Sequence, residues 1–531
     1  MEAVDEDDRR DSAGRAPASV PAVGEPAAEA GALVFIGFMG AGKTSAARTV
    51  AAELGTEALD SDRELERELG EPLEQYFDRE GESLFRLREE EVVLRMLARD
   101  DAQVIALGGG SLGSERVREA LARHTVIHLE VGAEDAWRRA SGKGRPLARD
   151  RGRFDQLHAD RRAIYETAAQ VTLPPAGRAA VRHAVPAVQA LARAPRGTRL
   201  VWAAAESGSY PVFFGRGLLG ATFFWPNDGR RFAVTDENVA ELHGVPADHR
   251  VTVPAGEQHK TVAGAEHVLR ELARAEMEGG DIVVGVGGGV VGDLAGFCAA
   301  VYQRGARHVQ VPTTLVAQVD SAYGGKTGVD LPEGKNYVGA YHQPSAVLCD
   351  PSALATLPPE EAAAGYAEVV KTALIAGGAL WSRVRAGEAP DDEVVLGCLR
   401  TKLAVVAEDE RDSGRRQVLN LGHTVGHALE AATGYSRLRH GEAVGIGLLC
   451  ALRLSGRTSL RDEVAGLLEA HGLPLSVEGV DVEEVLAASE RDKKREGGEV
   501  RFVLVEAPGD VSHGHEVDRD ALRAAVDEVL A

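Results

Sequence analysis

The chain has 531 residues, 44% of them hydrophobic and 27% charged, which is typical of a globular protein of several domains. Its net charge of −22 argues against a nucleic-acid partner, although clustered lysines and arginines can still bind an anion locally. No apolar run approaches the about 20 residues of a membrane span and no signal-peptide pattern is present, so we expect a cytoplasmic protein without a membrane partner.

The N-terminal third divides into a tail and a first domain. Residues 1–30 are rich in acidic residues, Pro, Ala and Gly and are predicted to be a disordered tail. Residues 31–195 alternate short apolar runs with helical patterns, which predicts an α/β domain. Its expected strands are Leu33–Ile36, Val104–Leu107 and Val126–Leu129.

The stretch Ala194–Thr198, rich in Pro, Arg and Gly, predicts a linker to a second α/β domain at residues 196–351. Residues 352–531 carry long amphipathic patterns and are predicted to be mainly helical. Four widely spaced cysteines predict buried thiols rather than disulfides or zinc ligands. The expected strands of the second domain are Arg231–Thr235, Ile282–Val286 and His308–Val311.

The segment Gly37–Thr44 fits the pattern G-x-x-x-x-G-K-[ST], follows an apolar run and precedes a helical pattern. In such a loop the backbone N–H groups turn toward phosphate, the lysine neutralises charge and the hydroxyl binds Mg²⁺. The sequence therefore predicts a site for a nucleotide phosphate and Mg²⁺, and the resemblance described below implies that the nucleotide is ATP. Its predicted members are Gly40, Gly42, Lys43, Thr44 and Ser45.

Two carboxylates, Asp60 and Asp62, follow this loop at spacing i, i+2. At the end of a strand, side chains at this spacing point the same way, so we expect one to reach Mg²⁺ and the other a substrate hydroxyl. Taken alone, the pattern is equally typical of a helix cap. The triple glycine Gly108–Gly110 is equally typical of a plain turn.

In this order behind a phosphate loop, these motifs resemble shikimate kinase over residues 31–175. The remaining members of the set are FR at 85–86, RPL at 145–147 and R-x-x-x-Y at 161–165. Ala148 departs from the family pattern and affects the packing of the lid. Gluconate kinase is the nearest related alternative, but it would need another use for the substrate-binding arginines.

The resemblance implies that Asp62 binds the shikimate hydroxyls and is the candidate base, while Asp60 holds Mg²⁺ through water. Glu89 would orient Arg86, and Lys43 would act on the phosphates. The other implied residues are Arg86 and Arg161 for the shikimate carboxylate, the Gly109 backbone near the ring, and Arg145 on a mobile lid over the transferring phosphoryl group.

The glycine-rich segment Gly287–Asp293 follows an expected strand and fits G-x-G-x-x-G, a weak signal for a dinucleotide. Downstream segments add hydroxyls, backbone N–H groups and two lysines, which predicts an anion-binding region. These segments are PTT at 312–314, SAYGGKT at 321–327 and GKN at 334–336.

A metal site is predicted by His423 and His427, which lie at i, i+4 on one helix face, with His440 downstream and Glu368 upstream. Two histidines and one carboxylate suit a catalytic Zn²⁺ with an open position. Spacing alone favours His423 and His427 as the ligand pair and cannot select Glu368.

Over about residues 200–510 the motifs resemble 3-dehydroquinate synthase. The resemblance implies a Rossmann-like NAD-binding domain, a helical metal-binding domain and a homodimer. It also implies Zn²⁺ or Co²⁺ on Glu368, His423 and His440, which places His427 near the substrate phosphate instead. The motifs are PAGEQHK, GGGVVGD, QRG, VPTTLVAQVDSAYGGKTGVD, GKN, AEVVK, LNLGHTVGHALE, HGEAV and DKK.

The resemblance assigns the remaining site residues in three groups. NAD would be held by Asp236, Asn238, Glu257, Lys260, Gly289, Asp293, Thr313 and Thr314, with Lys335 beside the nicotinamide. The phosphate end of the substrate would meet Lys326, Asn336, Arg416, Asn420, His427 and Arg304 of the partner subunit. Asp320, Lys371 and Lys402 would face the ring hydroxyls and carboxylate, and Lys493 or Lys494 would close over the substrate. Gln303 replaces the usual methionine before Arg304.

Two alternatives remain for the function. The second half could be a metal-dependent polyol dehydrogenase, although the cation and amide set at Lys326, Asn336 and Arg416 favours a phosphate substrate. The phosphate loop could belong to a non-catalytic regulatory module, although Lys43 and Asp62 are both intact.

Overall fold

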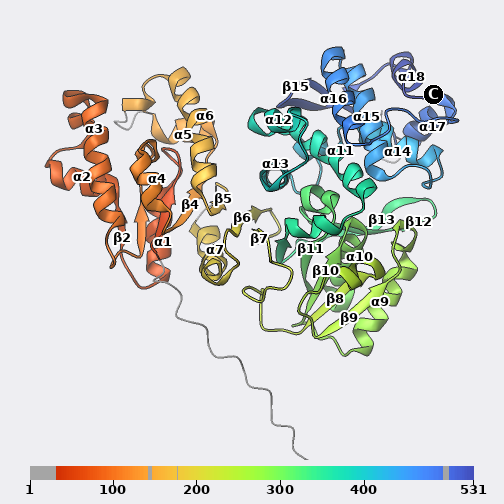
Figure 1. The fold of residues 1–531 in the computed structure, drawn as a ribbon, viewed down its shortest axis with the longest axis horizontal. Helices are drawn as coiled ribbons and strands as arrows, with labels where there is room; N and C mark the ends of the chain where they lie inside the picture. Colours follow the sequence, from red (N-terminus) through yellow and green to blue (C-terminus); the bar gives the residue numbers. More distant parts are fainter. Residues whose placement is uncertain (1–30, 142–145, 176–177, 494–500, 531) are drawn as a thin grey trace, which may run out of the picture. The chain divides into compact units, whose positions relative to one another are not determined.

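The computed structural model describes residues 31–141, 146–175, 178–493 and 501–530. Within these residues, two α/β regions precede a mainly helical region, as the sequence predicts (Figure 1). Across the same ranges, no helix combines the length and apolarity needed to cross a bilayer. The predicted tail, residues 1–30, lies outside the described residues.

The first α/β region contains parallel strands in the order β2-β3-β1-β4-β5. The three strands predicted here are confirmed to within one residue at each end. Strand β5, of three residues, was not among the predicted strands. The bounds are β1 Leu33–Ile36, β2 Ala58–Asp60, β3 Val104–Ala106, β4 Thr125–Leu129 and β5 Val171–Leu173.

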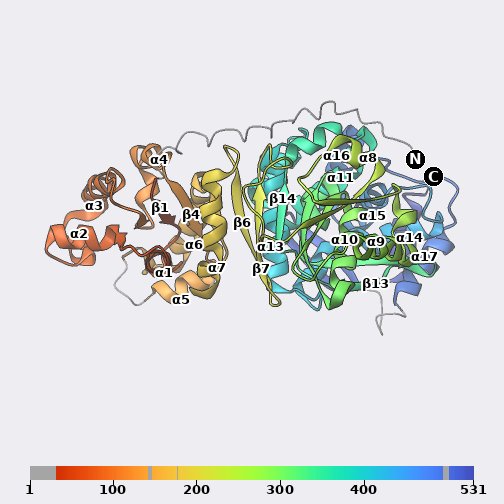
Figure 2. The ribbon, with the colours of Figure 1, turned by 90° about the horizontal axis from the view of Figure 1, so that it is seen from below.

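Helices cover both faces of this sheet because alternate strand residues point to opposite sides. Phe35 packs in one hydrophobic cluster with α1 and α7, whereas Val34 and Ile36 pack in another with α3, α4 and α6. Figure 2 shows α1 and α4 on opposite sides of β1. The helices are α1 Lys43–Glu53, α2 Ser61–Leu69, α3 Leu73–Leu97, α4 Glu115–Leu121, α5 Ala133–Ala140, α6 Arg151–Ala168 and α7 Arg178–Ala190.

The second α/β region continues the sheet in the order β6-β7-β14-β11-β10-β8-β9. Strand β6 is antiparallel to β7 and also pairs in parallel with β5, so 12 strands form one sheet. The three strands predicted in this region are confirmed. The bounds are β6 Arg199–Ala204, β7 Ser209–Phe214, β8 Arg231–Asp236, β9 His249–Val253, β10 Ile282–Gly287, β11 Arg307–Pro312 and β14 Ala346–Cys349.

Helices α9 and α10 flank β8 to β11 (Figure 1). The turn from β10 into α10 leaves no room for a side chain, because a Cβ on Gly287 would lie 2.6 Å from Cβ of Val291. The hairpin of β12 and β13 packs beside α10. The bounds are α8 Glu237–Leu242, α9 Val262–Arg274, α10 Gly289–Val301, β12 Lys326–Leu331 and β13 Gly334–Tyr341.

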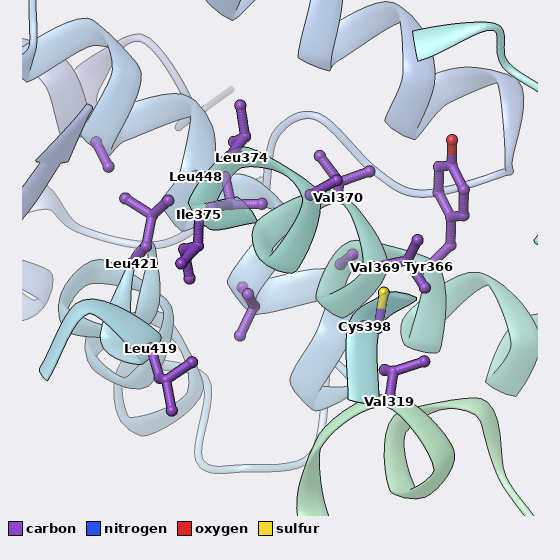
Figure 3. Packing of buried hydrophobic residues seen from close by; sticks show 14 of the residues in the cluster. Val319, Tyr366, Val369, Val370, Leu374, Ile375, Cys398, Leu419, Leu421 and Leu448 are labelled. Carbon is purple, nitrogen blue, oxygen red and sulfur yellow. The ribbon is translucent and has the colours of Figure 1, made fainter. Parts of the chain in front are cut away.

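The helical region packs around α11, which presents Tyr366, Val369 and Val370 to the core (Figure 3). All four cysteines are buried free thiols, which confirms the sequence expectation. The elements are α11 Pro359–Ala376, α12 Gly378–Arg385, α13 Asp392–Glu408, α14 His423–Ala432, α15 His440–Leu454, α16 Thr458–Ala470, α17 Val482–Lys493, β15 Arg501–Ala507, β16 Asp510–Glu516 and α18 Arg519–Asp527.

Candidate functional sites

The phosphate loop joins β1 to α1 in the predicted geometry. Gly40 and Gly42 have φ of 85° and 92°, the left-handed region that favours glycine. Nζ of Lys43 donates to the carbonyls of Gly37, at 2.8 Å, and Phe38, at 3.2 Å. The lysine therefore lies folded over the loop, at the N-terminus of α1, where backbone N–H groups favour an anion. Ser45 follows in the first turn of α1.

The two carboxylates lie on different elements. Thr44 Oγ1 donates to Asp60 Oδ2 at 2.6 Å, so the predicted Mg²⁺ residues already meet. However, β2 ends at Asp60, which caps α2, and Asp62 lies in the first turn of that helix. The expectation that both carboxylates share one strand face is therefore wrong. Asp62 instead faces Gly108, where a Cβ would lie 2.7 Å from Asp62 Oδ1.

The predicted carboxylate-binding arginines converge on the glycine-rich loop after β3. Arg86 donates to Glu89 at 2.6 Å, the contact expected to orient it. Arg161 Nη1 donates to the carbonyl of Gly109 at 2.9 Å. Burial lowers the pKa of Arg161, partly offset by Tyr165. Both guanidinium groups therefore border the same loop as Asp62.

Tyr165 is a site residue to which the sequence assigned no role. Its hydroxyl donates to Gly109 O at 2.5 Å and shares that acceptor with Arg161. Burial raises the pKa of Tyr165 to about 12, so the phenol keeps its proton. Arg161 and Tyr165 are four residues apart and so lie on one helix face, and this spacing could have indicated a role for Tyr165. Arg145 lies outside the described residues.

The predicted NAD residues gather around the C-terminal ends of β8, β10 and β11. Asp236 caps α8, accepting from Val239 N at 2.9 Å, and Asn238 follows in that helix. A Cβ on Gly289 would lie 3.0 Å from Ser321 Oγ. Thr314 Oγ1 accepts from Ala317 N at 3.3 Å.

Two buried hydroxyls in this region accept and donate nothing among the described residues, namely Thr313 Oγ1 and Ser321 Oγ. Buried polar atoms are nearly always paired, so these hydroxyls fit a bound molecule with its own polar atoms. A dinucleotide, with its hydroxyls and phosphates, has the required chemistry.

Lys260 lies at the centre of the charged groups in the predicted NAD region. The residue is only 4% exposed, and its Nζ lies 2.9 Å from Glu257, 3.3 Å from Asp293 and 3.0 Å from Asn336 Oδ1. Burial lowers its pKa, but the carboxylates more than offset this and the net shift is upward. Burial also raises the pKa of Asp293 to about 6, against the pull of Lys260.

Glu368, His423 and His440 form a group whose donor atoms all lie within 4.8 Å of one another. Glu368 Oε1 is 3.6 Å from His423 Nε2 and 3.5 Å from His440 Nε2, and Glu368 is 1% exposed. His423 Nδ1 lies 3.2 Å from Leu421 O, which leaves Nε2 to face Glu368. This donor set fits a divalent metal.

His427 does not belong to that group. It forms a second one with Glu430 and His440, and its ring centroid lies 5.3 Å from that of His423. The pairing of His423 with His427 that spacing favoured is therefore less suited to a metal than the set containing Glu368. Burial lowers the pKa of His423 well below its usual range, which keeps the imidazole neutral.

Asp320 lies between two lysines next to this group. Its Oδ2 accepts from Lys371 at 2.8 Å and its Oδ1 pairs with Lys402. Lys371 also forms an ion pair with Glu368. Burial lowers the pKa of Lys402, aided by the charges of Lys371 and Arg416 and opposed by Asp320.

The predicted phosphate residues are held by acidic and carbonyl groups. Lys326 pairs with Asp412, a residue that the sequence did not single out. Arg416 is buried and donates to the carbonyls of Gly324, at 3.1 Å, and Glu410. Asn336 has φ of 57° and accepts from Lys260. Asn420 ends a short turn before α14 and is exposed.

The remaining predicted residues are Arg304, Lys335 and one of Lys493 and Lys494. Arg304 lies on an exposed turn after α10, with φ of 71°. Lys335 pairs with Glu430 at 2.9 Å. Lys493 is the last residue of α17, its side chain is not described, and Lys494 lies outside the described residues.

Family models match both halves of the chain. The shikimate kinase model matches residues 39–191. The N-terminal and C-terminal models of 3-dehydroquinate synthase match residues 250–364 and 365–495.

Individual relatives agree. The 3-dehydroquinate synthase of Symbiobacterium thermophilum is 44% identical over 344 residues, covering 59% of this chain and 96% of the relative. The 3-dehydroquinate synthase of Halorhodospira halophila is 42% identical over 355 residues, covering 62% of this chain and 100% of the relative. A solved structure of 2-epi-5-epi-valiolone synthase from Streptomyces hygroscopicus subsp. jinggangensis 5008, with NAD⁺ and Zn²⁺ bound, is 26% identical with a TM-score of 0.57, covering 61% of this chain and 98% of that one.

Proposed function

The chain belongs to the 3-dehydroquinate synthase family and carries a shikimate kinase domain, and from this premise we propose that it catalyses both reactions. One is ATP-dependent phosphorylation of shikimate to shikimate 3-phosphate. The other converts 3-deoxy-D-arabino-heptulosonate 7-phosphate to 3-dehydroquinate and phosphate. The group of Glu368, His423 and His440 beside buried lysines carries the second proposal most directly.

In the kinase site, the shikimate hydroxyl oxygen attacks the γ-phosphorus and the bond to the β-phosphate oxygen breaks, releasing ADP. Asp62 takes the hydroxyl proton, and Lys43 offsets charge on the phosphates. Thr44 and Asp60, 2.6 Å apart, would hold Mg²⁺. Arg86 and Arg161 bind the carboxylate, because a planar fork suits a planar anion. Arg145 is proposed for the lid from its motif alone.

In the synthase site, NAD and a divalent metal supply, when bound, a reversible oxidation of one ring alcohol and polarisation of its oxygen. Glu368, His423 and His440 would hold Zn²⁺ or Co²⁺. The cluster of Asp320, Lys371 and Lys402 orients the ring hydroxyls and carboxylate, because Lys371 already pairs with the metal-binding Glu368 and Asp320 holds Lys402 beside Lys371.

The phosphate end of the heptulosonate binds among lysine, arginine, amide and imidazole groups, which together suit an anion. Lys326 pairs with Asp412 and is half-exposed, so its other N–H groups can donate to the phosphate. The phosphate group leaves together with the proton of the adjacent carbon, which a phosphate oxygen can accept, and the elimination product stays in place for ring closure. The phosphate-binding set is Lys326, Asn336, Arg416, Asn420 and His427, with Arg304 of the partner subunit in a homodimer.

The kinase proposal is tested on the full chain by ADP release with and without shikimate. Asp62→Asn is expected to reduce shikimate-dependent release at least about 100-fold, since general-base catalysis contributes 10²–10⁴-fold. The control Asp155→Asn removes an exposed carboxylate paired with Arg151 and is expected to leave release unchanged. ADP release that does not depend on shikimate would contradict the proposal.

The synthase proposal is tested by following phosphate, 3-dehydroquinate and NADH together. We expect equal amounts of phosphate and 3-dehydroquinate with no accumulation of NADH, because the hydride is returned each cycle. Accumulation of NADH with a simple polyol, and no phosphate release from the heptulosonate, would favour the dehydrogenase alternative.

A further inference from the structure

One buried carboxylate, Glu430, touches both cofactor regions of the synthase site and has no role in the reaction described above. Glu430 is 2% exposed and lies on α14, the helix that begins at His423. His423, His427 and Glu430 are spaced i, i+4 and i+7, so they lie on one face of that helix.

The two oxygens of Glu430 have different partners. Oε2 lies 3.4 Å from Nδ1 of His440, a metal-binding residue on α15. If Nδ1 donates to this carboxylate, Nε2 keeps its lone pair, and Nε2 is the atom that lies 3.5 Å from Glu368. Oε1 accepts from Nζ of Lys335 at 2.9 Å.

Lys335 continues the connection toward the dinucleotide region. Its Nζ lies 3.9 Å from Glu257, which in turn lies 2.9 Å from Lys260. Lys260 reaches Asp293 at 3.3 Å, and Asp293 ends the glycine-rich segment Gly287–Asp293 within α10. An unbroken series of charges thus runs from the imidazole of a metal ligand to the glycine-rich loop.

We propose that Glu430 is a positioning residue that couples metal binding to NAD binding by holding His440 with one oxygen and Lys335 with the other. The proposal rests on the assigned NAD and metal sites. When both cofactors are bound, Glu430 fixes the tautomer of His440 and the place of Lys335 at once. Occupancy of either site then orders the shared carboxylate for the other.

The test measures the Zn²⁺ dissociation constant of the full chain by competition with a chromophoric chelator, with and without saturating NAD⁺. By linkage, the factor by which NAD⁺ tightens Zn²⁺ equals the factor by which Zn²⁺ tightens NAD⁺. We expect this factor to be roughly 5-fold or more in the wild type. In Glu430→Gln it should fall to about 1, and Zn²⁺ alone should bind roughly 10–100-fold more weakly.

Two further variants fix the interpretation. Lys335→Gln removes only the contact between residue 335 and Glu430. The coupling factor should therefore fall to about 1, while Zn²⁺ affinity without NAD⁺ stays near the wild-type value. This variant also carries the test if Glu430→Gln fails to fold. Glu361→Gln removes a partly exposed carboxylate 3.0 Å from Arg439, next to His440, and should change neither affinity nor coupling.

The proposal is overturned if the wild type shows no coupling, or if Glu430→Gln and Lys335→Gln keep the wild-type factor. Weaker Zn²⁺ binding in Glu430→Gln with unchanged coupling also overturns it, because Glu430 would then serve the metal alone. Wild-type turnover to 3-dehydroquinate tests the proposed function separately from all of these outcomes.

Discussion

Asp320 is the residue on which the buried charges of the synthase site depend. Burial alone would raise its pKa, but Lys371 and Lys402 hold that pKa well below its usual range. The carboxylate therefore stays ionised between two ammonium groups. Without it, Lys402 would lose the one partner that the described structure gives its Nζ.

Asp320→Asn is expected to destabilise the synthase part by roughly 3 kcal/mol, because removing one partner leaves a buried charge uncompensated. The midpoint of its thermal unfolding should fall by at least about 5 °C. Glu266→Gln breaks an exposed ion pair with Arg270 and should lower the midpoint by no more than about 2 °C. Equal midpoints for Asp320→Asn and the wild type would contradict this account.

Gly108 marks the point where the kinase site is most tightly packed. An added Cβ would lie 2.5 Å from Glu89 Oε1 and 2.7 Å from Asp62 Oδ1. Gly108→Ala should therefore displace both carboxylates and lower shikimate-dependent ADP release roughly 10–100-fold, since a displacement of about 1 Å can cost 10²-fold. Gly113→Ala, which would meet nothing within 4 Å, is the matched control. Similar rates in both variants would refute the packing argument.

A residue inside a motif was predictable only where its type has one chemical use in that pattern. Glu430 and Asp412 were not, since their roles depend on partners 95 and 86 positions away in the sequence. His427 shows that spacing alone cannot select metal ligands. His423 and His427 lie on one helix face and are typical of a ligand pair, but Glu368 on α11 forms the candidate group with His423 and His440.

At the scale of elements, the turn after α13 positions Arg416, which we propose binds the substrate phosphate. Asp409 accepts backbone N–H bonds from Ser413 at 3.1 Å, Gly414 at 2.7 Å and Arg416 at 3.0 Å. Partial burial opposes ionisation, but these donors hold the pKa of Asp409 at about 2. The folded turn therefore prefers the ionised carboxylate.

Because the folded pKa lies below the unfolded value of about 3.9, Asp409 stabilises the fold above pH 4 and loses this effect as the pH falls toward 2. The urea midpoint of the wild type should exceed that of Asp409→Asn by a constant amount between pH 7 and 5. The gap should narrow at pH 3. A gap that is constant from pH 7 to 3 would contradict the assigned pKa.

Continuous apolar runs were predictable as strands, whereas the residue at which a strand ends was not always predictable. The strands at Leu33–Ile36 and Ile282–Gly287 are continuous apolar runs, as buried parallel strands should be. Strand β2 ends at Asp60 because that carboxylate caps α2, accepting from Arg63 N at 3.2 Å. A helix cap and a strand end share the same residue here, so the sequence alone could not separate them.

At the scale of the whole molecule, the two sites lie on different elements of one continuous sheet. The phosphate loop follows β1, whereas the glycine-rich loop of the synthase follows β10. Strand β6 pairs with β5 directly after the predicted linker, a contact between strands that no local pattern could reveal. The predicted domain boundaries themselves stay predictions.

The two proposed activities need different metals, so removing one metal should stop one activity and leave the other. We expect chelator treatment, followed by removal of the chelator, to strip the metal that we propose for Glu368, His423 and His440. The kinase needs only Mg²⁺ near Thr44 and Asp60, which excess Mg²⁺ in the assay restores. Synthase activity should return on adding Zn²⁺ or Co²⁺.

The most direct measurement of the central claim is therefore one preparation of metal-stripped full chain, verified by elemental analysis and assayed in excess Mg²⁺. We predict shikimate-dependent ADP release within about twofold of the untreated protein and no 3-dehydroquinate from the heptulosonate. Formation of 3-dehydroquinate at the native rate by the stripped protein would contradict the account.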